Sequence, residues 1–110
     1  MILGIGIDLI EVARIKKAMD NPRFLKRILT EREMLSNMTP EYVAGRWASK
    51  EAISKSTIFT LKWHNVQILN NKVGMPEVEI LGVPDFYGKI MLSISHSKNN
   101  AVAVAIWISK

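Results

Sequence analysis

Val43-Ala-Gly-Arg-Trp-Ala-Ser-Lys-Glu-Ala-Ile-Ser-Lys-Ser56 is the stretch around which this chain is organised. The residues just before it are typical of a helix start. Thr39 suits the N-cap, Pro40 the first helical position and Glu41 the first turn. We therefore predict one helix that begins at Pro40 and runs through the whole stretch.

Glu51 has an unusual place in this helix. With about 3.6 residues per turn, it falls on the apolar side, together with Val43 and Trp47. A carboxylate on a core-facing side needs a cationic partner, and the candidates are Lys55 one turn later or a metal ion. The plainer alternative is that Glu51 and Lys55 form an ordinary surface pair worth about 0.3–0.5 kcal/mol.

The neighbours of Glu51 favour a functional role for this helix. Ala44, Ala48 and Ala52 keep one side of it low, so that another backbone or a ligand can approach. Arg46 and Lys50 add positive charge one turn apart on the flank. A carboxylate, several cations and small residues together resemble a site for phosphate and metal.

The composition limits the remaining possibilities. The 110 residues are expected to form a single domain covering residues 1–110. The absence of cysteine excludes disulfides, thiol catalysis and cysteine-bound zinc, and makes the reducing cytoplasm the simplest location. No segment has the pattern of a signal peptide or a membrane span, so no membrane partner is expected. A net charge of +5 predicts an acidic partner, such as nucleic acid, a phosphate-rich small molecule or an acidic protein.

The N-terminal segment Met1–Leu9 alternates and is β-branched, which predicts a buried strand. Gly4 and Gly6 share one face, so another element is expected to pack closely there, with Asp8 at the end of that face. Asp8 and Glu11 also have capping-box spacing, so Asp8 could instead begin a helix over Leu9–Met19.

Short helices should follow the first strand. One opens at Asn21-Pro22, and a capping box of Thr30 and Glu33 predicts another that reaches about Asn37. Their exposed sides are rich in basic residues, which are either simply solvated or a docking surface for an acidic partner. These residues are Arg14, Lys16, Lys17, Arg23, Lys26, Arg27 and Arg32.

The C-terminal half is expected to form strands. The predicted strands are Val66–Leu69, Pro76–Leu81, Ile90–His96 and Ala101–Ile108, with the last two joined as a hairpin. His96 therefore lies at a strand end beside a turn that bears Ser97. The nucleotide-binding loops, nucleophile elbow and zinc-protease motif of common enzymes are absent.

Four segments, in this order, resemble one family. They are Gly4-Ile-Gly-Ile-Asp-Leu-Ile-Glu-Val-Ala-Arg-Ile15, Arg23-Phe-Leu-Lys-Arg-Ile-Leu-Thr-Glu-Arg-Glu33, Gly45-Arg-Trp-Ala-Ser-Lys-Glu-Ala-Ile-Ser-Lys55 and Ser93-Ile-Ser-His-Ser97. The chain thus resembles the holo-[acyl-carrier-protein] synthases, the small trimeric class of 4′-phosphopantetheinyl transferases. The resemblance implies an α+β fold, with a mostly antiparallel sheet packed on one long and several short helices.

The resemblance also implies a reaction. The phosphopantetheine arm of coenzyme A would be transferred to a serine of apo acyl carrier protein, in fatty acid biosynthesis, with release of adenosine 3′,5′-bisphosphate. Asp8 and Glu51 would bind Mg²⁺, which suits ions held by one or two carboxylates and substrate phosphates. Glu51 or a metal-bound water would accept the serine proton, and Lys55 would stabilise or protonate the leaving bisphosphate.

Further residues are implied as binding groups. Arg46 and His96 would hold coenzyme A phosphates and would come from a neighbouring subunit of a homotrimer; Ser97 and Pro76 belong to the same coenzyme A set. An acidic carrier protein would dock on the helix surface that carries Arg14, Arg23 and Arg27.

The chain departs from the family pattern in two places. The usual glycine-rich loop after the central helix is replaced by the glycine-free run Ser56–His64, or is missing from this sequence. The usual Gly-Lys-Pro turn contains Met75. Two alternatives stay open, a degenerate synthase that binds coenzyme A weakly and a basic nucleic-acid-binding domain; the second leaves Asp8 and Glu51 without a role.

Overall fold

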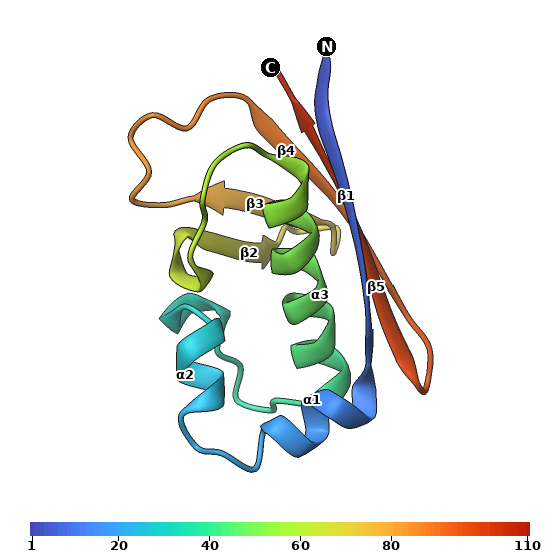
Figure 1. The fold of residues 1–110 in the computed structure, drawn as a ribbon. Helices are drawn as coiled ribbons and strands as arrows, with labels where there is room; N and C mark the ends of the chain where they lie inside the picture. Colours follow the sequence, from blue (N-terminus) through green and yellow to red (C-terminus); the bar gives the residue numbers. More distant parts are fainter.

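The computed structural model describes residues 1–110, and its longest helix lies between two sheets (Figure 1). The elements in chain order are β1 (Ile2–Glu11), α1 (Val12–Ala18), α2 (Phe24–Ile28), the 3₁₀ turn η1 (Glu31–Glu33), α3 (Pro40–Ser56), the 3₁₀ turn η2 (Trp63–Asn65), β2 (Val66–Asn70), β3 (Pro76–Ile80), β4 (Lys89–His96) and β5 (Asn100–Ile108). The α+β prediction is confirmed.

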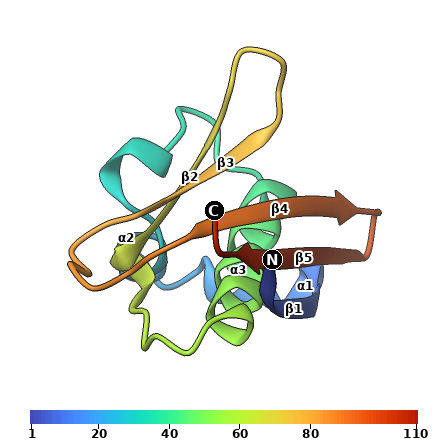
Figure 2. The same ribbon diagram turned by 90° about the horizontal axis from the view of Figure 1, so that it is seen from above.

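The larger sheet has the order β1-β5-β4, and every pair of neighbours is antiparallel. β4 and β5 form the predicted hairpin, and β1 pairs with the other side of β5. The smaller sheet is the antiparallel pair β2 and β3. Seen from above, α3 lies against the larger sheet, and the β2–β3 hairpin lies on the β4 side of that sheet (Figure 2). The chain termini lie next to each other (Figure 1).

The central helix begins as predicted. The side chain of Thr39 accepts a hydrogen bond from the backbone N–H of Tyr42 at 3.1 Å, and Pro40 is the first helical residue.

None of the helices has both the length and the apolar composition that a membrane-spanning helix requires.

The two glycines of β1 are explained by close contact with α3. A Cβ on Gly6 would lie 2.0 Å from the carbonyl oxygen of Ala52, and one on Gly4 would lie 1.9 Å from that of Ser56. Only glycine allows the strand to approach the helix this closely. The expectation that another element packs on this face is therefore confirmed.

The prediction that β1 is buried is wrong for its other face. Ile5, Ile7 and Leu9 are 65%, 59% and 65% exposed in the single chain. Their face of the sheet lies opposite to α3, and nothing in this chain covers it.

The alternative in which Asp8 begins a helix is also wrong. β1 continues to Glu11, which pairs with Asn100 of β5, and α1 begins only at Val12 without a side-chain cap. Pairing with β5 satisfies the backbone groups that a capping box would otherwise satisfy. Asp8 is instead part of the strand, opposite Ala103.

The predicted helix from Thr30 to about Asn37 is shorter in the structure. The capping box is present, because the backbone N–H of Thr30 donates to Glu33 Oε1 at 2.7 Å. However, only the 3₁₀ turn Glu31–Glu33 forms. The Glu33 carboxylate also binds α3 and β2, and these contacts fix the turn where a longer helix was expected.

Candidate functional site

Asp8 and Lys55 meet where β1 packs on α3. Lys55 Nζ lies 3.1 Å from Asp8 Oδ1 and donates a second hydrogen bond to the carbonyl oxygen of Ile7 at 3.2 Å. The Lys55 side chain is 54% exposed and that of Asp8 15%. One ammonium proton and the second carboxylate oxygen of Asp8 thus have no partner in the chain.

Glu51 lies one turn before Lys55 and accepts no hydrogen bond or salt bridge within the chain. Its side chain is half-buried and lines a cavity of about 440 Å³ together with Ser54, Leu61 and Trp63. Glu51 does not form the pair with Lys55 that was considered as an alternative. It also does not lie at the centre of a buried apolar stripe, because its side chain is only half-buried. Both carboxylate oxygens of Glu51 are free to bind a ligand.

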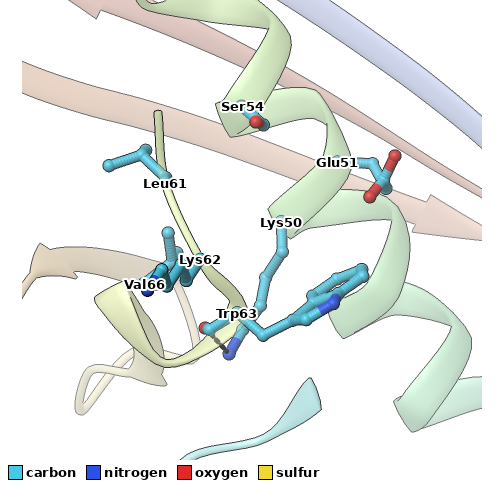
Figure 3. A pocket seen from close by; sticks show the side chains of 7 residues that line it. All are labelled: Lys50, Glu51, Ser54, Leu61, Lys62, Trp63 and Val66. Carbon is cyan, nitrogen blue, oxygen red and sulfur yellow. Dashed lines mark hydrogen bonds between the residues drawn. The ribbon is translucent and has the colours of Figure 1, made fainter. Parts of the chain in front are cut away.

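Lys50, which the sequence placed on the flank, is one of two charged residues that α3 buries, together with Arg46. Its ammonium donates to Glu33 Oε1 at 2.7 Å, to the carbonyl oxygen of Ile28 at 2.8 Å and to that of Trp63 at 3.0 Å. Lys50 and Glu51 leave the helix in different directions (Figure 3). Burial lowers the pKa of Lys50 from its usual 10.5, while Glu33 opposes this shift.

This difference from the predicted stripe has a simple cause. The larger sheet covers one side of α3, while α1, Phe24 of α2 and Trp63 contact other sides, so several faces of the helix are buried at once. A single apolar stripe describes a helix that packs on one side only. The resulting buried polar residues of α3 are Arg46, Ser49, Lys50 and Ser56.

Three of the predicted coenzyme A residues share one cavity. Arg46, Pro76 and His96 line a space of about 270 Å³ that is also lined by Tyr42 and Asn70. They come from α3, the start of β3 and the end of β4. Ser97 lies in the turn after β4, is exposed, and does not line this cavity.

Arg46 is buried without an acidic partner. It is 6% exposed, its Nη2 donates to Asn70 Oδ1 at 3.2 Å, and its Nε has no hydrogen-bond partner. The guanidinium carbon lies 4.7 Å from the centre of the Tyr42 ring. A buried guanidinium that lacks a carboxylate is suited to bind an anion in the cavity.

The two pairs are separated because their sheet residues lie at opposite edges of the larger sheet. Asp8 is on the edge strand β1 and His96 on the other edge strand β4, with β5 between them. The structure therefore brings Asp8 to Lys55 and Arg46 to His96, but it does not combine the two pairs in one cavity of a single chain.

The three arginines predicted to bind a partner are all exposed. Arg14 is in α1, Arg23 precedes α2 and Arg27 lies near the end of α2. None of them forms a salt bridge within the chain. They are free to pair with an acidic surface.

Asp8 and Glu51 could supply only some of the ligands that a Mg²⁺ ion needs. Asp8 and Glu51 offer carboxylate oxygens, the ligand type that Mg²⁺ prefers. No group of three or more His, Cys, Asp or Glu residues in the chain could hold a metal. Such a site needs further ligands from water or from substrate phosphates.

Sequence reasoning missed Tyr42, Asn70 and the role of Glu33. Tyr42 and Arg46 are four residues apart, which is the spacing of neighbours on a helix surface, so this contact could have been predicted. Asn70 could not, because it reaches Arg46 only through the packing of β2 against α3.

Comparison with known proteins gives one consistent result. Residues 4–106 match the 4′-phosphopantetheinyl transferase superfamily. A holo-[acyl-carrier-protein] synthase of Clostridium tetani is 45% identical, and the match covers 96% of this chain and 95% of that protein. One of Chlorobaculum tepidum is 41% identical, with 96% and 97% covered.

Solved structures with the same fold include ligand complexes. A holo-(acyl-carrier-protein) synthase of Bacillus anthracis in complex with CoA (3′,5′-ADP) has a TM-score of 0.87 and 38% identity, covering all of this chain and 99% of that one. The synthase of Helicobacter pylori in complex with coenzyme A has a TM-score of 0.84 and 29% identity, covering 94% and 99%.

The match to the Clostridium tetani protein extends over 122 residues, whereas this chain has 110 in total. The relative therefore carries residues inside the matched region that this chain lacks. A shortened segment after α3 agrees with this difference, because the glycine-rich loop expected there is absent.

Proposed function

Since this chain belongs to the holo-[acyl-carrier-protein] synthases of the 4′-phosphopantetheinyl transferase superfamily, we propose that it transfers the 4′-phosphopantetheine group of coenzyme A to a serine of apo acyl carrier protein. The serine oxygen attacks the phosphorus atom that bears the pantetheine arm. A new P–O bond forms to serine, and the pyrophosphate P–O bond breaks. Adenosine 3′,5′-bisphosphate leaves.

The observation that carries this proposal is the buried guanidinium of Arg46, which has no acidic partner and lines a cavity together with His96. A phosphate group of coenzyme A would supply the missing negative charge. Pro76 would shape the same cavity, and Ser97 in the adjoining turn would donate a hydroxyl at its rim.

Asp8 and Glu51 are the proposed Mg²⁺ ligands. When bound, the ion would neutralise negative charge on the pyrophosphate during the transfer. Asp8 offers the oxygen that Lys55 does not occupy, and the Glu51 carboxylate has no partner in the chain.

Glu51 and Lys55 are the proposed catalytic residues. Glu51 would accept the proton of the attacking serine, and the absence of a partner for its carboxylate within the chain supports this role. Lys55 would give a proton or a hydrogen bond to the departing bisphosphate from its exposed ammonium.

We further propose that the active site forms between subunits of a homotrimer. Asp8, Glu51 and Lys55 of one subunit would face Arg46 and His96 of another, since Asp8 and His96 of one chain lie on opposite edge strands of its sheet. The exposed apolar side chains Ile5, Ile7 and Leu9 support burial of this sheet face by another copy. Each subunit would be a single domain of residues 1–110.

The carrier protein is proposed to dock on α1 and α2. An acidic surface would pair with Arg14, Arg23 and Arg27, which are exposed and have no partners within the chain. The modified carrier would serve fatty acid biosynthesis in the cytoplasm, a reducing compartment that suits a chain without cysteine.

The direct test is mass spectrometry of an apo acyl carrier protein incubated with the purified protein, coenzyme A and Mg²⁺. We expect the carrier to gain one phosphopantetheine group, and the gain to disappear with chelator or with Glu51→Gln. The control is Glu77→Gln, an exposed acidic residue on β3. An unchanged carrier mass would refute the proposal, and tight nucleic-acid binding that Glu51→Gln preserves would favour the alternative function.

A further inference from the structure

Arg46 is buried but has very few polar partners in the chain. Its only hydrogen bond goes to Asn70 Oδ1, and neither of the two salt bridges of the chain involves it. The guanidinium also lies over the ring of Tyr42, with its carbon atom 4.7 Å from the ring centre. Tyr42 is one turn earlier on α3 and lines the same cavity.

Tyr42 is itself held by the buried network around Glu33. Its hydroxyl donates to the backbone carbonyl oxygen of Glu33 at 2.7 Å. The Glu33 carboxylate accepts from Lys50 Nζ, from the backbone N–H of Thr30 and from that of Ile68, each at 2.7 Å. Glu33 is fully buried, so the carbonyl that anchors Tyr42 belongs to a fixed part of the core.

We propose that Tyr42 is a positioning residue for Arg46. The face of its ring supports the guanidinium, and its hydroxyl bond to Glu33 fixes the ring. This arrangement keeps a buried cation aimed at the cavity without a salt bridge that would compete with the incoming phosphate. Glu41 also lines the cavity, but it forms no salt bridge with Arg46. The inference rests on the proposed function, in which Arg46 binds a phosphate of coenzyme A.

The charge state of Tyr42 agrees with this role. Burial raises the pKa of the Tyr42 phenol above its usual 10.0, although the nearby Arg46 acts in the opposite direction. The phenol therefore stays neutral at physiological pH, and its proton remains available for the Glu33 carbonyl.

The test measures binding of adenosine 3′,5′-bisphosphate by calorimetry in a double-mutant cycle of Tyr42→Leu and Arg46→Ala. Loss of the ring should weaken binding between about twofold and thirtyfold when Arg46 is present. In the Arg46→Ala background the same change should have no further effect. Tyr42→Phe keeps the ring, so we expect less than about threefold weakening.

The matched control is Tyr87→Leu. Tyr87 packs against Phe59 and Trp107, near the beginning of β4, whereas the cavity lies near the end of that strand. This variant should bind the bisphosphate like the parent.

The outcomes separate the inference from the proposed function. If Arg46→Ala weakens binding but Tyr42→Leu does not, the positioning role is wrong and the proposed function stands. If Tyr42→Leu weakens binding equally in both backgrounds, Tyr42 acts without Arg46 and the inference is wrong. If Arg46→Ala binds like the parent, both are wrong.

A second measurement covers the case in which Tyr42→Leu does not fold. Phenylalanines with increasing fluorination at position 42 keep the ring shape but reduce the negative potential of its face. Affinity for the bisphosphate should then fall stepwise in the parent and stay constant in Arg46→Ala. A flat series in the parent would refute the role of the ring.

Discussion

Lys50 and Lys55 lie five residues apart on α3 and have opposite surroundings. The Lys50 side chain is 2% exposed and uses all its donors on Glu33 and two backbone carbonyls. Lys55 is 54% exposed, meets Asp8 at 3.1 Å and keeps one donor free. Both residues form a salt bridge to an acidic residue distant in sequence, yet only Lys55 keeps an N–H donor that has no partner in the chain.

The two lysines of α3 therefore have different roles, one in holding the core together and one at the candidate site. The pair of Lys50 and Glu33 joins α3 to η1, η2 and β2, so it fixes the core. The pair of Lys55 and Asp8 lies at the surface, where water screens it and a ligand can compete for it. Stability should therefore depend on Lys50, and activity on Lys55.

The largest expected effect is on stability. Lys50→Met leaves the Glu33 carboxylate buried without its cation, so we expect a loss of about 3–5 kcal/mol in the free energy of unfolding. Denaturant titration followed by circular dichroism measures it. The matched control Lys55→Met should lose less than about 1 kcal/mol, because its pair is exposed.

A double variant sharpens the same comparison. Adding Glu33→Gln to Lys50→Met removes the uncompensated charge. The loss in the free energy of unfolding of the double variant should therefore be about 1–3 kcal/mol smaller than the sum of the losses of the two single variants. Equal losses in Lys50→Met and Lys55→Met, or strict additivity in the double variant, would contradict the assigned difference.

The next effect is on the reaction. Lys55→Met removes the exposed ammonium, and we expect kcat for carrier modification to fall about 10²–10³-fold while the melting temperature stays near that of the parent. Lys55→Arg keeps the charge and should retain part of the activity. Parent-like kcat in Lys55→Met would exclude a catalytic role for this residue.

A substitution in β1 should disturb Lys55 and spare Lys50. In Gly6→Ala the new methyl group would meet the carbonyl oxygen of Ala52 at 2.0 Å, so strand and helix must separate where Asp8 contacts Lys55. We expect a loss of about 1–3 kcal/mol by denaturant titration, together with reduced activity.

The control for this prediction is Gly45→Ala on α3. There the new methyl group would meet only a methyl carbon of Ile94 at 3.3 Å, which can shift. A change within about 1 kcal/mol is expected, since alanine favours the helix. If Gly6→Ala were as mild as Gly45→Ala, the close packing of β1 on α3 would be refuted.

The smallest expected effect is on the ionisation of Tyr42, which is bonded to the backbone of Glu33 and lines the Arg46 cavity. Tyr42 should ionise above pH 10.0, because burial raises its pKa, and the pKa should rise further in Arg46→Ala. Its stabilising contribution is complete below pH 10.0 and is lost as pH rises through the folded-state pKa. Ultraviolet difference titration against Tyr42→Phe measures the midpoint; a midpoint at or below 10.0 would contradict the prediction.

The sequence by itself determined the elements whose signals are local. The N-cap of α3, the glycine face of β1, the capping box of Thr30 and the β4–β5 hairpin follow from neighbouring residues, and the structure confirms them. The same motifs placed Asp8 and Lys55 among the site residues, and these two residues are in contact.

Only the tertiary structure decided which charges are buried. Several elements cover α3 at once, so Lys50 is buried with Glu33, Glu51 is only half-buried, and Arg46 is enclosed beside Tyr42 and Asn70. Helical periodicity gives the direction of a side chain but not the elements that meet it, since those contacts join residues far apart in the chain. The same reason explains why β1, which was predicted to be buried, exposes an apolar face that a single chain cannot cover.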